Sequence, residues 1–332
     1  MARHHIVQDK YLTQWRKADT ENQLNIYVIP ENNIIERGPG WKGFWREDFN
    51  VLNSDDGKSY LPEDIASLVD TKGIEAIKRI DRLIRAQLDG TDRSFIAFYV
   101  ALQYVRTPRR REETNKLMRA TIQHFMRKDI SSVDQVHMTK AEILKHTPIN
   151  KHEEKALEEI SKMSDEEVRQ KIFESIHGGD YVAGLNNTGH SKQILKVDRE
   201  AKELFESQWL FLVAPKGTSF VTSDNPCFTI STSKIMNGLL SPKSIVFFPL
   251  KPDICIYIRP GIKSQKEEYL DLNEKEVDEI NQLVLFNSYE CVVAKDREQL
   301  ENLTKEYNYK NHKKSRDVTI SELGDYTMFN ME

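Results

Sequence analysis

The sequence has few of the residues that mark disulfide-stabilised, disordered or membrane-spanning proteins. Its three cysteines, Cys227, Cys255 and Cys291, are odd in number and isolated in apolar segments, so neither a disulfide framework nor a zinc knuckle is indicated. With 14 glycines and 11 prolines among 332 residues, the composition favours regular structure over linkers. No apolar run reaches the roughly 18 residues of a membrane helix, and the N-terminus lacks the apolar stretch of a signal peptide. We therefore expect a folded, cytoplasmic protein with no membrane partner.

Charge of either sign is also not in excess. The chain has 48 Lys and Arg against 52 Asp and Glu, a net charge of -4, so any attraction to nucleic acid must be local. Familiar chemical motifs are missing too: there is no Walker loop, Rossmann glycine triplet, His-Glu-x-x-His or Gly-x-Ser-x-Gly. No standard motif assigns a reaction.

The residues that are present predict an α+β fold. We expect a mostly antiparallel sheet from an N-terminal hairpin and C-terminal strands, with a large helical middle section. Residues 1–60 would hold the hairpin and an aromatic loop, 61–208 the helices, as an insertion, and 209–332 the α+β region that completes the sheet. The expected helices are 62–84, divided near Gly73, then 94–106, 109–127, 151–163, 164–176, 191–207, 274–286 and 297–307. The expected strands are 24–29, 34–37, 209–214, 219–222, 227–232, 244–250, 254–259 and 289–294.

An apolar run over residues 95–105 places Gln103 and Arg106 at the end of a helix that should be buried. A buried guanidinium needs an anionic partner. Because the two residues are three apart, they share a helical face and could grip one oxyanion, and a phosphate would suit them. The alternative is an internal ion pair, in which Arg106 meets a carboxylate such as Asp70 or Glu75 and ties two helices together.

The next residues predict a break in the helix. Thr107 is a good N-cap and Pro108 a good first helical residue, whereas Pro108 would disrupt a helix that ran on smoothly. The arginines at 109–111 follow the break. Arg110 is a candidate for substrate binding, and a solvated helix face is the alternative for all three.

Two histidines near the N-terminus are candidates for acid–base chemistry. His4 and His5 are adjacent, so on an extended segment they point to opposite faces and at most one would look into a pocket. A mobile N-terminus or a structural histidine would explain them equally well.

The segment Thr222-Ser223-Asp224-Asn225-Pro226 lies between two predicted strands and is first of all a turn, since Asp and Ser bond nearby backbone N–H groups. In the functional alternative, Asp224 faces a cavity as a base, as an orienter of histidine or as a metal ligand, and Thr222, Ser223 and Asn225 contact substrate beside it. A separate basic segment, residues 310–316, could touch nucleic-acid phosphates, or it could simply be solvated.

Five spaced segments together resemble the bacterial domain of unknown function 4238 family. They are residues 4–15, 103–108, Trp209, 222–226 and 248–252, and the resemblance spans roughly residues 4 to 295. The chain departs from the family at Gln8, where proline is usual, and at Asp70, where glutamate is usual. The family has no settled activity to transfer. The resemblance implies that His4 or His5, Gln103, Arg106 and Asp224 occupy motif positions and share one pocket.

These observations lead to the hypothesis of a hydrolase acting on a phosphate-bearing substrate, in the first place a nuclease of RNA or DNA. Gln103 and Arg106 would bind the scissile phosphate, His4 or His5 would act as general acid or base, and Asp224 would orient it or hold a divalent metal such as Mg²⁺. The alternatives are a non-catalytic sensor or partner-binding module and a transferase that uses a nucleotide. A phage-defence or toxin system would suit such a nuclease. The sequence predicts no oligomeric state.

Overall fold

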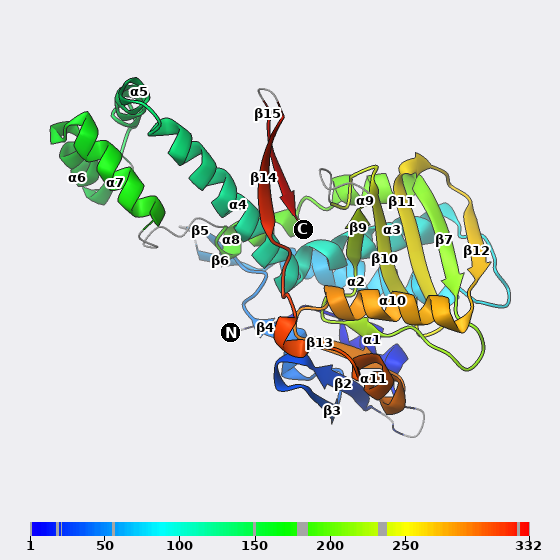
Figure 1. The fold of residues 1–332 in the computed structure, drawn as a ribbon. Coiled ribbons are helices and arrows are strands. Elements are labelled where there is room, and N and C mark those ends of the chain that lie inside the picture. Colours follow the sequence, from blue (N-terminus) through cyan, green and yellow to red (C-terminus); the bar gives the residue numbers. More distant parts are fainter. Residues whose placement is uncertain are drawn as a thin grey trace. The chain divides into compact units, whose positions relative to one another are not determined.

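The computed structural model describes residues 2–17, 20, 22–54, 57–148, 151–177, 185–231, 238–323 and 326–331. The chain divides into two compact units (Figure 1). The first comprises residues 1–113, 185–319 and 330–332, and the second comprises 114–184 and 320–329. Two of the four boundaries, after residues 113 and 184, fall inside the predicted helical region 61–208, so only the central part of that region belongs to the second unit. The predicted α+β class with mostly antiparallel sheets is confirmed.

A four-stranded antiparallel sheet joins the N-terminal hairpin to strands from the C-terminal part of the chain. Its spatial order is β3 (Asn33–Arg37), β2 (Leu24–Val28), β13 (Cys291–Ala294) and β8 (Thr222–Ser223). The hairpin turns through Asn32, whose φ of 48° lies in the left-handed region that asparagine tolerates. The prediction that the hairpin and C-terminal strands share a sheet is therefore confirmed for β13 and β8, whereas the other predicted C-terminal strands form a sheet of their own.

The second large sheet of the first unit has five strands. Its order is β12 (Glu267–Asp271), β7 (Ser207–Val213), β11 (Ile254–Lys263), β10 (Ser244–Lys251) and β9 (Phe228–Ser231). All pairs are antiparallel except β12 with β7. The predicted strand 227–232 corresponds to β9, and its last residue, 232, lies outside the described residues. Smaller pairs join β1 (Arg3–His5) to β4 (Trp45–Glu47), β5 (Leu52–Ser54) to β6 (Gly57–Ser59) and β14 (Val318–Leu323) to β15 (Tyr326–Met331).

Helices supply the remaining structure. In the first unit they are α1 (Asp9–Leu12), α2 (Leu61–Arg79), α3 (Gly90–Arg106), α8 (Asn187–Ile194), α9 (Asp198–Glu206), α10 (Glu274–Asn287) and α11 (Arg297–Thr304), with short 3-10 turns at Thr13–Trp15, Ile29–Glu31, Lys42–Phe44 and η4 (Tyr309–Asn311). The others are α4 (Pro108–Asp129), α5 (Val133–Ile143), α6 (Lys151–Lys162) and α7 (Asp165–His177). Among the described residues, no helix combines the length and apolarity that a membrane crossing requires.

The predicted break after α3 is confirmed. Thr107 is extended, with ψ 152°, and α4 begins at Pro108. Two other expectations were wrong. Gly73 does not divide α2, which runs unbroken through it. Its role is in packing: a Cβ there would lie 2.5 Å from the Cβ of Tyr99, so the missing side chain lets α2 approach α3. The predicted helix 191–207 is instead two helices, α8 and α9, and the turn between them lets both Ile194 and Val197 reach the core.

Helix α3 lies at the centre of the first unit. It packs against α2, α8 and α9, and its residues Ile96, Tyr99, Val100 and Ala101 are almost fully buried. Asp89 caps its N-terminus by accepting a hydrogen bond from the backbone N–H of Asp92 at 2.7 Å. The apolar run that predicted a buried helix thus brings the polar residues at its C-terminal end into the interior.

Candidate functional site

Arg106 forms an internal ion pair. Its Nη1 donates to Oδ2 of Asp70 on α2 at 2.8 Å, and both side chains are buried. Burial raises the pKa of the Asp70 carboxyl, and the guanidinium opposes that rise. Glu75, the other carboxylate considered, is exposed and lies 3.3 Å from Lys72. The structure therefore has the internal pairing between two helices rather than a guanidinium without a carboxylate, and Gln103 beside it is fully buried.

Asp224 joins the 222–226 turn to the start of β13. Its Oδ1 accepts the backbone N–H of Tyr289 at 2.8 Å and its Oδ2 accepts that of Glu290 at 2.7 Å. Its own N–H donates to the carbonyl of Cys291 at 3.3 Å. Burial raises the pKa of this carboxyl to about 6. Because both carboxylate oxygens have backbone donors, Asp224 fixes the turn, and its catalytic role stays a prediction.

The neighbours of Asp224 also make internal hydrogen bonds. The hydroxyl of Thr222 lies 2.7 Å from that of Tyr11, and Ser223 accepts the backbone N–H of Asn225 at 3.1 Å. Asn225 accepts from the hydroxyl of Thr107 at 2.8 Å and donates to the carbonyl of Asn287 at 2.7 Å. The turn is thereby tied to the break between α3 and α4, which brings two of the predicted segments together.

The two histidines lie apart from this turn. His4 is buried in β1, where its Nδ1 accepts the backbone N–H of Asn50 at 2.8 Å and burial lowers its pKa. His5 is half-buried, with Nε2 3.4 Å from Asp9. Within the described part of the chain, no hydrogen bond, ion pair or ring contact joins either histidine to Asp224. The single pocket that the resemblance implied is not formed by these contacts.

The arginines at 109–111 do not form a solvated face. Arg109 and Arg111 are buried and Arg110 is half-buried. Arg111 donates to the side-chain oxygens of Asn187 at 2.7 Å and Asn50 at 2.9 Å, and burial lowers its pKa to about 9. The expectation of solvation was wrong for Arg109 and Arg111 because α4 begins against the body of the first unit.

Three guanidinium groups surround the carboxylate of Glu113. Arg316 donates to its two oxygens, at 2.9 Å each, while Nε of Arg109 lies 3.4 Å and Nη1 of Arg110 3.5 Å from them. Burial alone would raise the pKa of Glu113, but the hydrogen bonds and charges of these arginines hold it at about 2. We call these four residues the Glu113 cluster. It places more positive than negative charge at one spot in the first unit.

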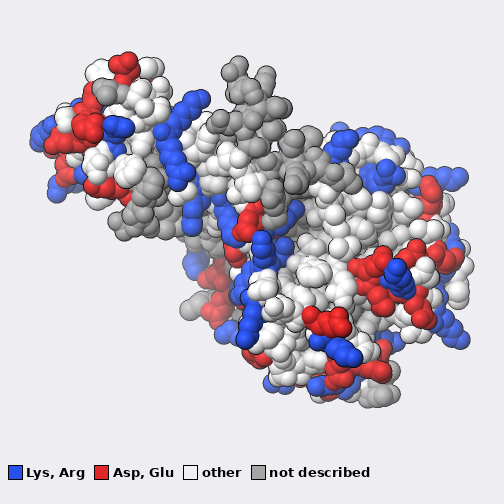
Figure 2. Space-filling view, in the orientation of Figure 1, with Lys and Arg blue, Asp and Glu red and all other residues white. Residues whose placement is uncertain are grey.

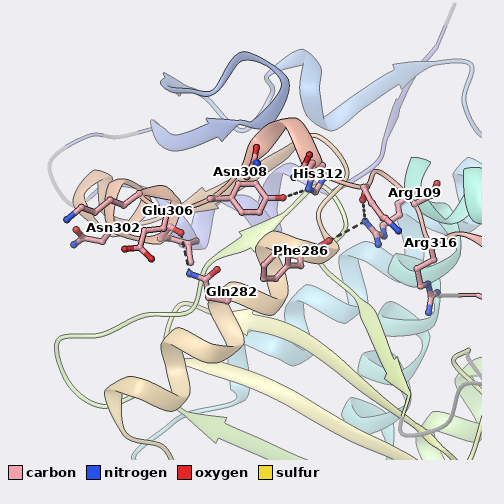
Figure 3. Close-up of a pocket in the computed structure, with 14 residues that line it drawn as sticks. Arg109, Gln282, Phe286, Asn302, Glu306, Asn308, His312 and Arg316 are labelled. Carbon is pink, nitrogen blue, oxygen red and sulfur yellow. Dashed lines mark hydrogen bonds between the residues drawn. The ribbon is translucent and has the colours of Figure 1, made fainter.

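The Glu113 cluster borders an open cavity of about 760 Å³, here called the C-terminal pocket (Figure 3). It lies between α10 and residues 302–316. Its lining includes four cationic side chains, Arg109, Lys305, Lys313 and Arg316, and one carboxylate, Glu306. Figure 2 shows Lys and Arg gathered on this face over η4 and the chain that follows it. The predicted substrate-binding residues Arg110 and Asn225 line a small adjoining void with Arg109 and Arg316.

The C-terminal pocket also contains an aromatic ring and several amides. Phe286, at the end of α10, is 56% exposed, and its ring meets that of Tyr307 edge-on at 5.7 Å. Amide side chains line the same cavity at Gln282, Asn302, Asn308 and Asn311. Gln282 donates to the carbonyl of Leu303 at 3.3 Å, which ties α10 to α11. The cavity therefore offers cations, hydrogen-bonding amides and an apolar ring.

His312 is the imidazole of the C-terminal pocket, and its ring is held on both sides. Nε2 lies 3.2 Å from the carbonyl of Tyr289, which can only accept, so this nitrogen carries the proton. The hydroxyl of Tyr307 then donates to Nδ1. Burial lowers the pKa of His312 and raises that of Tyr307 to about 12, which agrees with a neutral ring and a protonated phenol. His312 positions the pocket wall and has no spare nitrogen for catalysis in this arrangement.

The described residues contain no ready-made cluster of ligands for the divalent metal that the sequence suggested, and the metal stays a prediction. No group of three or more His, Cys, Asp or Glu among them is arranged to hold a metal ion. Asp70 is bound to Arg106, and Asp224 is bound to backbone N–H groups. Asp224, the metal ligand that the sequence suggested, thus has both carboxylate oxygens engaged by the chain itself.

Part of the C-terminal pocket is recognisable in the sequence, and the rest is not. The basic segment 310–316 was a correct signal of local positive charge, since it supplies Lys313 and Arg316. The four-residue spacing of Arg109 and Glu113 on one helix could have indicated an ion pair. Phe286 gave no signal, because an apolar residue at the end of an amphipathic helix is expected to be buried.

A family model described as "Protein of unknown function (DUF4238)" matches residues 3–298 of the chain. No curated protein matches the chain. No solved structure matches it either.

Proposed function

The chain belongs to the family of proteins of unknown function DUF4238, and for this member we propose binding of a phosphate-bearing ligand in the C-terminal pocket. One observation carries the proposal: the pocket lining has four cationic side chains against a single carboxylate. Guanidinium and ammonium groups are the side chains that bind phosphate oxygens most strongly. Lys305 is exposed and has no ion-pair partner among the described residues, so its charge is available to a ligand.

The phosphate-binding role proposed here belongs to the cations of the C-terminal pocket and no longer to Gln103 and Arg106. Gln103 and Arg106 are fully buried, and Arg106 already has the carboxylate of Asp70 as its partner. A ligand could reach them only by opening the packing between α2 and α3 and displacing a buried ion pair, which costs several kcal/mol. The C-terminal pocket differs in two ways: Arg109 and Arg316 share Glu113 with Arg110 and so keep a net positive charge, and Lys305 and Lys313 are exposed at an open cavity.

The enzymatic form of the proposal is a hydrolase, in the first place a nuclease of RNA or DNA. The match between a cationic pocket and a phosphodiester substrate supports it. The non-catalytic alternative, a sensor or partner-binding module, is favoured by the state of the polar groups. Both nitrogens of His312 and both carboxylate oxygens of Asp224 are already engaged. A transferase that uses a nucleotide would need the same phosphate-binding wall.

Titration with pyrophosphate tests binding. Calorimetry should detect a complex that weakens as salt is raised, because exposed charges are screened. Combining Lys305→Gln with Lys313→Gln removes two of the four cations and should lower the affinity at least tenfold, about 1.4 kcal/mol. Lys275→Gln is the matched control, since this lysine lies at the start of α10 with its side chain 86% exposed. No binding, or equal loss in the control, contradicts the proposal.

Incubation with single-stranded RNA and DNA, with and without Mg²⁺, separates the enzymatic form from the binding form. Cleavage that disappears in the Lys305→Gln/Lys313→Gln variant would support a nuclease. Binding without cleavage would support the sensor. Full cleavage by His4→Ala and Asp224→Ala variants that remain folded would remove these residues from the proposed catalytic set.

A further inference from the structure

The C-terminal pocket contains features that a bare phosphate would leave unused. Phe286 presents 56% of its surface to solvent, although the residues just before it on α10, Val284 and Leu285, are fully buried. An exposed phenyl ring beside cations is the arrangement with which proteins bind flat, anionic ligands. We infer that the ligand is a nucleoside phosphate whose base stacks on Phe286; this inference rests on the proposed phosphate binding.

The arrangement along the cavity gives the ligand a direction. Figure 3 shows Phe286 between two chemically different ends, with Arg109 and Arg316 on one side and Asn302 and Glu306 on the other. The end with Arg109 and Arg316, here called the guanidinium end, suits the phosphate because these two arginines and Arg110 carry more charge than the Glu113 carboxylate they surround. The exposed ammonium of Lys313 lies beside them, whereas Lys305, next to Glu306 in the chain, belongs to the other end. With the phosphate at that guanidinium end, the ring of Phe286 lies where the base of the nucleotide would be. The end with Asn302 and Glu306, here called the far end, then contacts the edge of the base.

The far end offers groups that can bond to a base edge. The side chains of Asn302 and Asn308 are exposed, and neither has a hydrogen bond to another described residue. A carboxamide has both donor and acceptor atoms and so matches the mixed donors and acceptors of a base. Glu306 adds an acceptor for an exocyclic amino group. An inorganic oxyanion bound at the guanidinium end would make no hydrogen bond with these carboxamides or with the Glu306 carboxylate.

The size of the cavity agrees with this ligand. A volume of about 760 Å³ lies within the range of small-molecule sites, about 300 to 1,000 Å³. A phosphate alone would occupy only the guanidinium end. The same nucleoside phosphate chemistry is offered by a free nucleotide and by a nucleotide within a single strand, and the test below distinguishes them.

The test compares four phosphate-bearing ligands on one protein. Calorimetric titrations of the full chain would use inorganic phosphate, adenosine 5′-monophosphate, pyrophosphate and a short single-stranded oligonucleotide. The nucleotide should bind more tightly than inorganic phosphate. Phe286→Leu keeps an apolar side chain but removes the ring, so it should weaken nucleotide binding about tenfold, as loss of one stacked base does, and leave pyrophosphate binding unchanged.

A matched control is Phe173→Leu, which removes an exposed ring, 48% accessible, from α7 in the second unit and should change nothing. If pyrophosphate binds but the nucleotide gains nothing over phosphate and ignores Phe286→Leu, the inference is overturned and the proposed function survives. If neither ligand binds, the proposed function itself fails. An oligonucleotide that binds more tightly than the free nucleotide, with the same loss in Phe286→Leu, supports the inference and identifies a strand as the source.

Discussion

At the scale of single residues, buried polar side chains are explained by partners that are far away in the sequence. Arg106 was recognisable as a residue that must have an anion, because an apolar run carries it into the interior. Its partner was not decided by the sequence, since Asp70 lies 36 positions earlier on another helix and Glu75 and a ligand were equally compatible. The same holds for Asp224, whose turn was predictable but whose two donors come from residues 289 and 290.

The Arg106–Asp70 pair should stabilise the fold rather than bind ligand. Arg106→Met leaves the buried carboxylate of Asp70 without a cation and should lower the free energy of unfolding by about 3 to 5 kcal/mol. Adding Asp70→Leu should restore much of that loss, because no charge then remains buried. Chemical denaturation measures both variants.

Arg297→Met is the control for that experiment. Arg297 pairs with Glu301 at 2.9 Å, but its side chain is 50% exposed, so the change should cost less than about 1 kcal/mol. Wild-type stability in Arg106→Met, together with weaker pyrophosphate binding, would contradict the structural role and return Arg106 to the phosphate site.

Glu113 should make the stability of the protein depend on pH. Its folded pKa of about 2 lies below the usual 4.5, so its contribution is fully present above pH 4.5 and is lost as the pH falls towards 2. A depression of this size corresponds to about 3 kcal/mol. Glu113→Gln should therefore be less stable than wild type by that order at pH 7, with a difference that shrinks on acidification. Urea unfolding at a series of pH values checks this, and a difference independent of pH would contradict it.

At the scale of helices and strands, the sequence was sufficient to predict those features that depend on a few neighbouring residues. The hairpin around Asn32 and the break at Thr107 depend on backbone preferences of a few residues. Thr107 also accepts the backbone N–H of Arg110 at 3.4 Å, as an N-cap does. Strand β12 was missed because Glu267–Asp271 is polar: Glu267 is buried only through its ion pair with Arg93, and the strand pairs with β7, about 60 residues earlier.

The close approach of α2 and α3 predicts the effect of a single methyl group. Gly73→Ala would place a Cβ 2.5 Å from that of Tyr99, so the helices must separate, at a cost of about 1 to 3 kcal/mol. Gly90→Ala, at the first residue of α3, has no atom within 4 Å of the new Cβ and should be neutral or slightly stabilising. Thermal unfolding of the two variants compares them, and equal effects would show that helix propensity, not packing, decides the outcome.

At the scale of the whole molecule, the net charge of -4 conceals a local surplus of cations. The C-terminal pocket is built from the start of α4, the end of α10 and residues 302–316, so almost 200 residues separate the parts of one wall. Composition and motif spacing cannot place such parts together. The sequence therefore predicted phosphate binding through residues 103–106. Of the residues that line the open cationic cavity, it singled out segment 310–316, as one that could touch phosphates or be solvated, and gave no sign of Phe286 or Lys305.

The most direct test of the account locates the ligand. Backbone amide resonances of the deuterated protein, followed by NMR during titration with pyrophosphate, report which residues it approaches. The account predicts shifts at Phe286 and through residues 302–316, which saturate together, with residues 103–106 and 222–225 unchanged. Shifts confined to His4 and residues 103–106, with the C-terminal pocket silent, would contradict it.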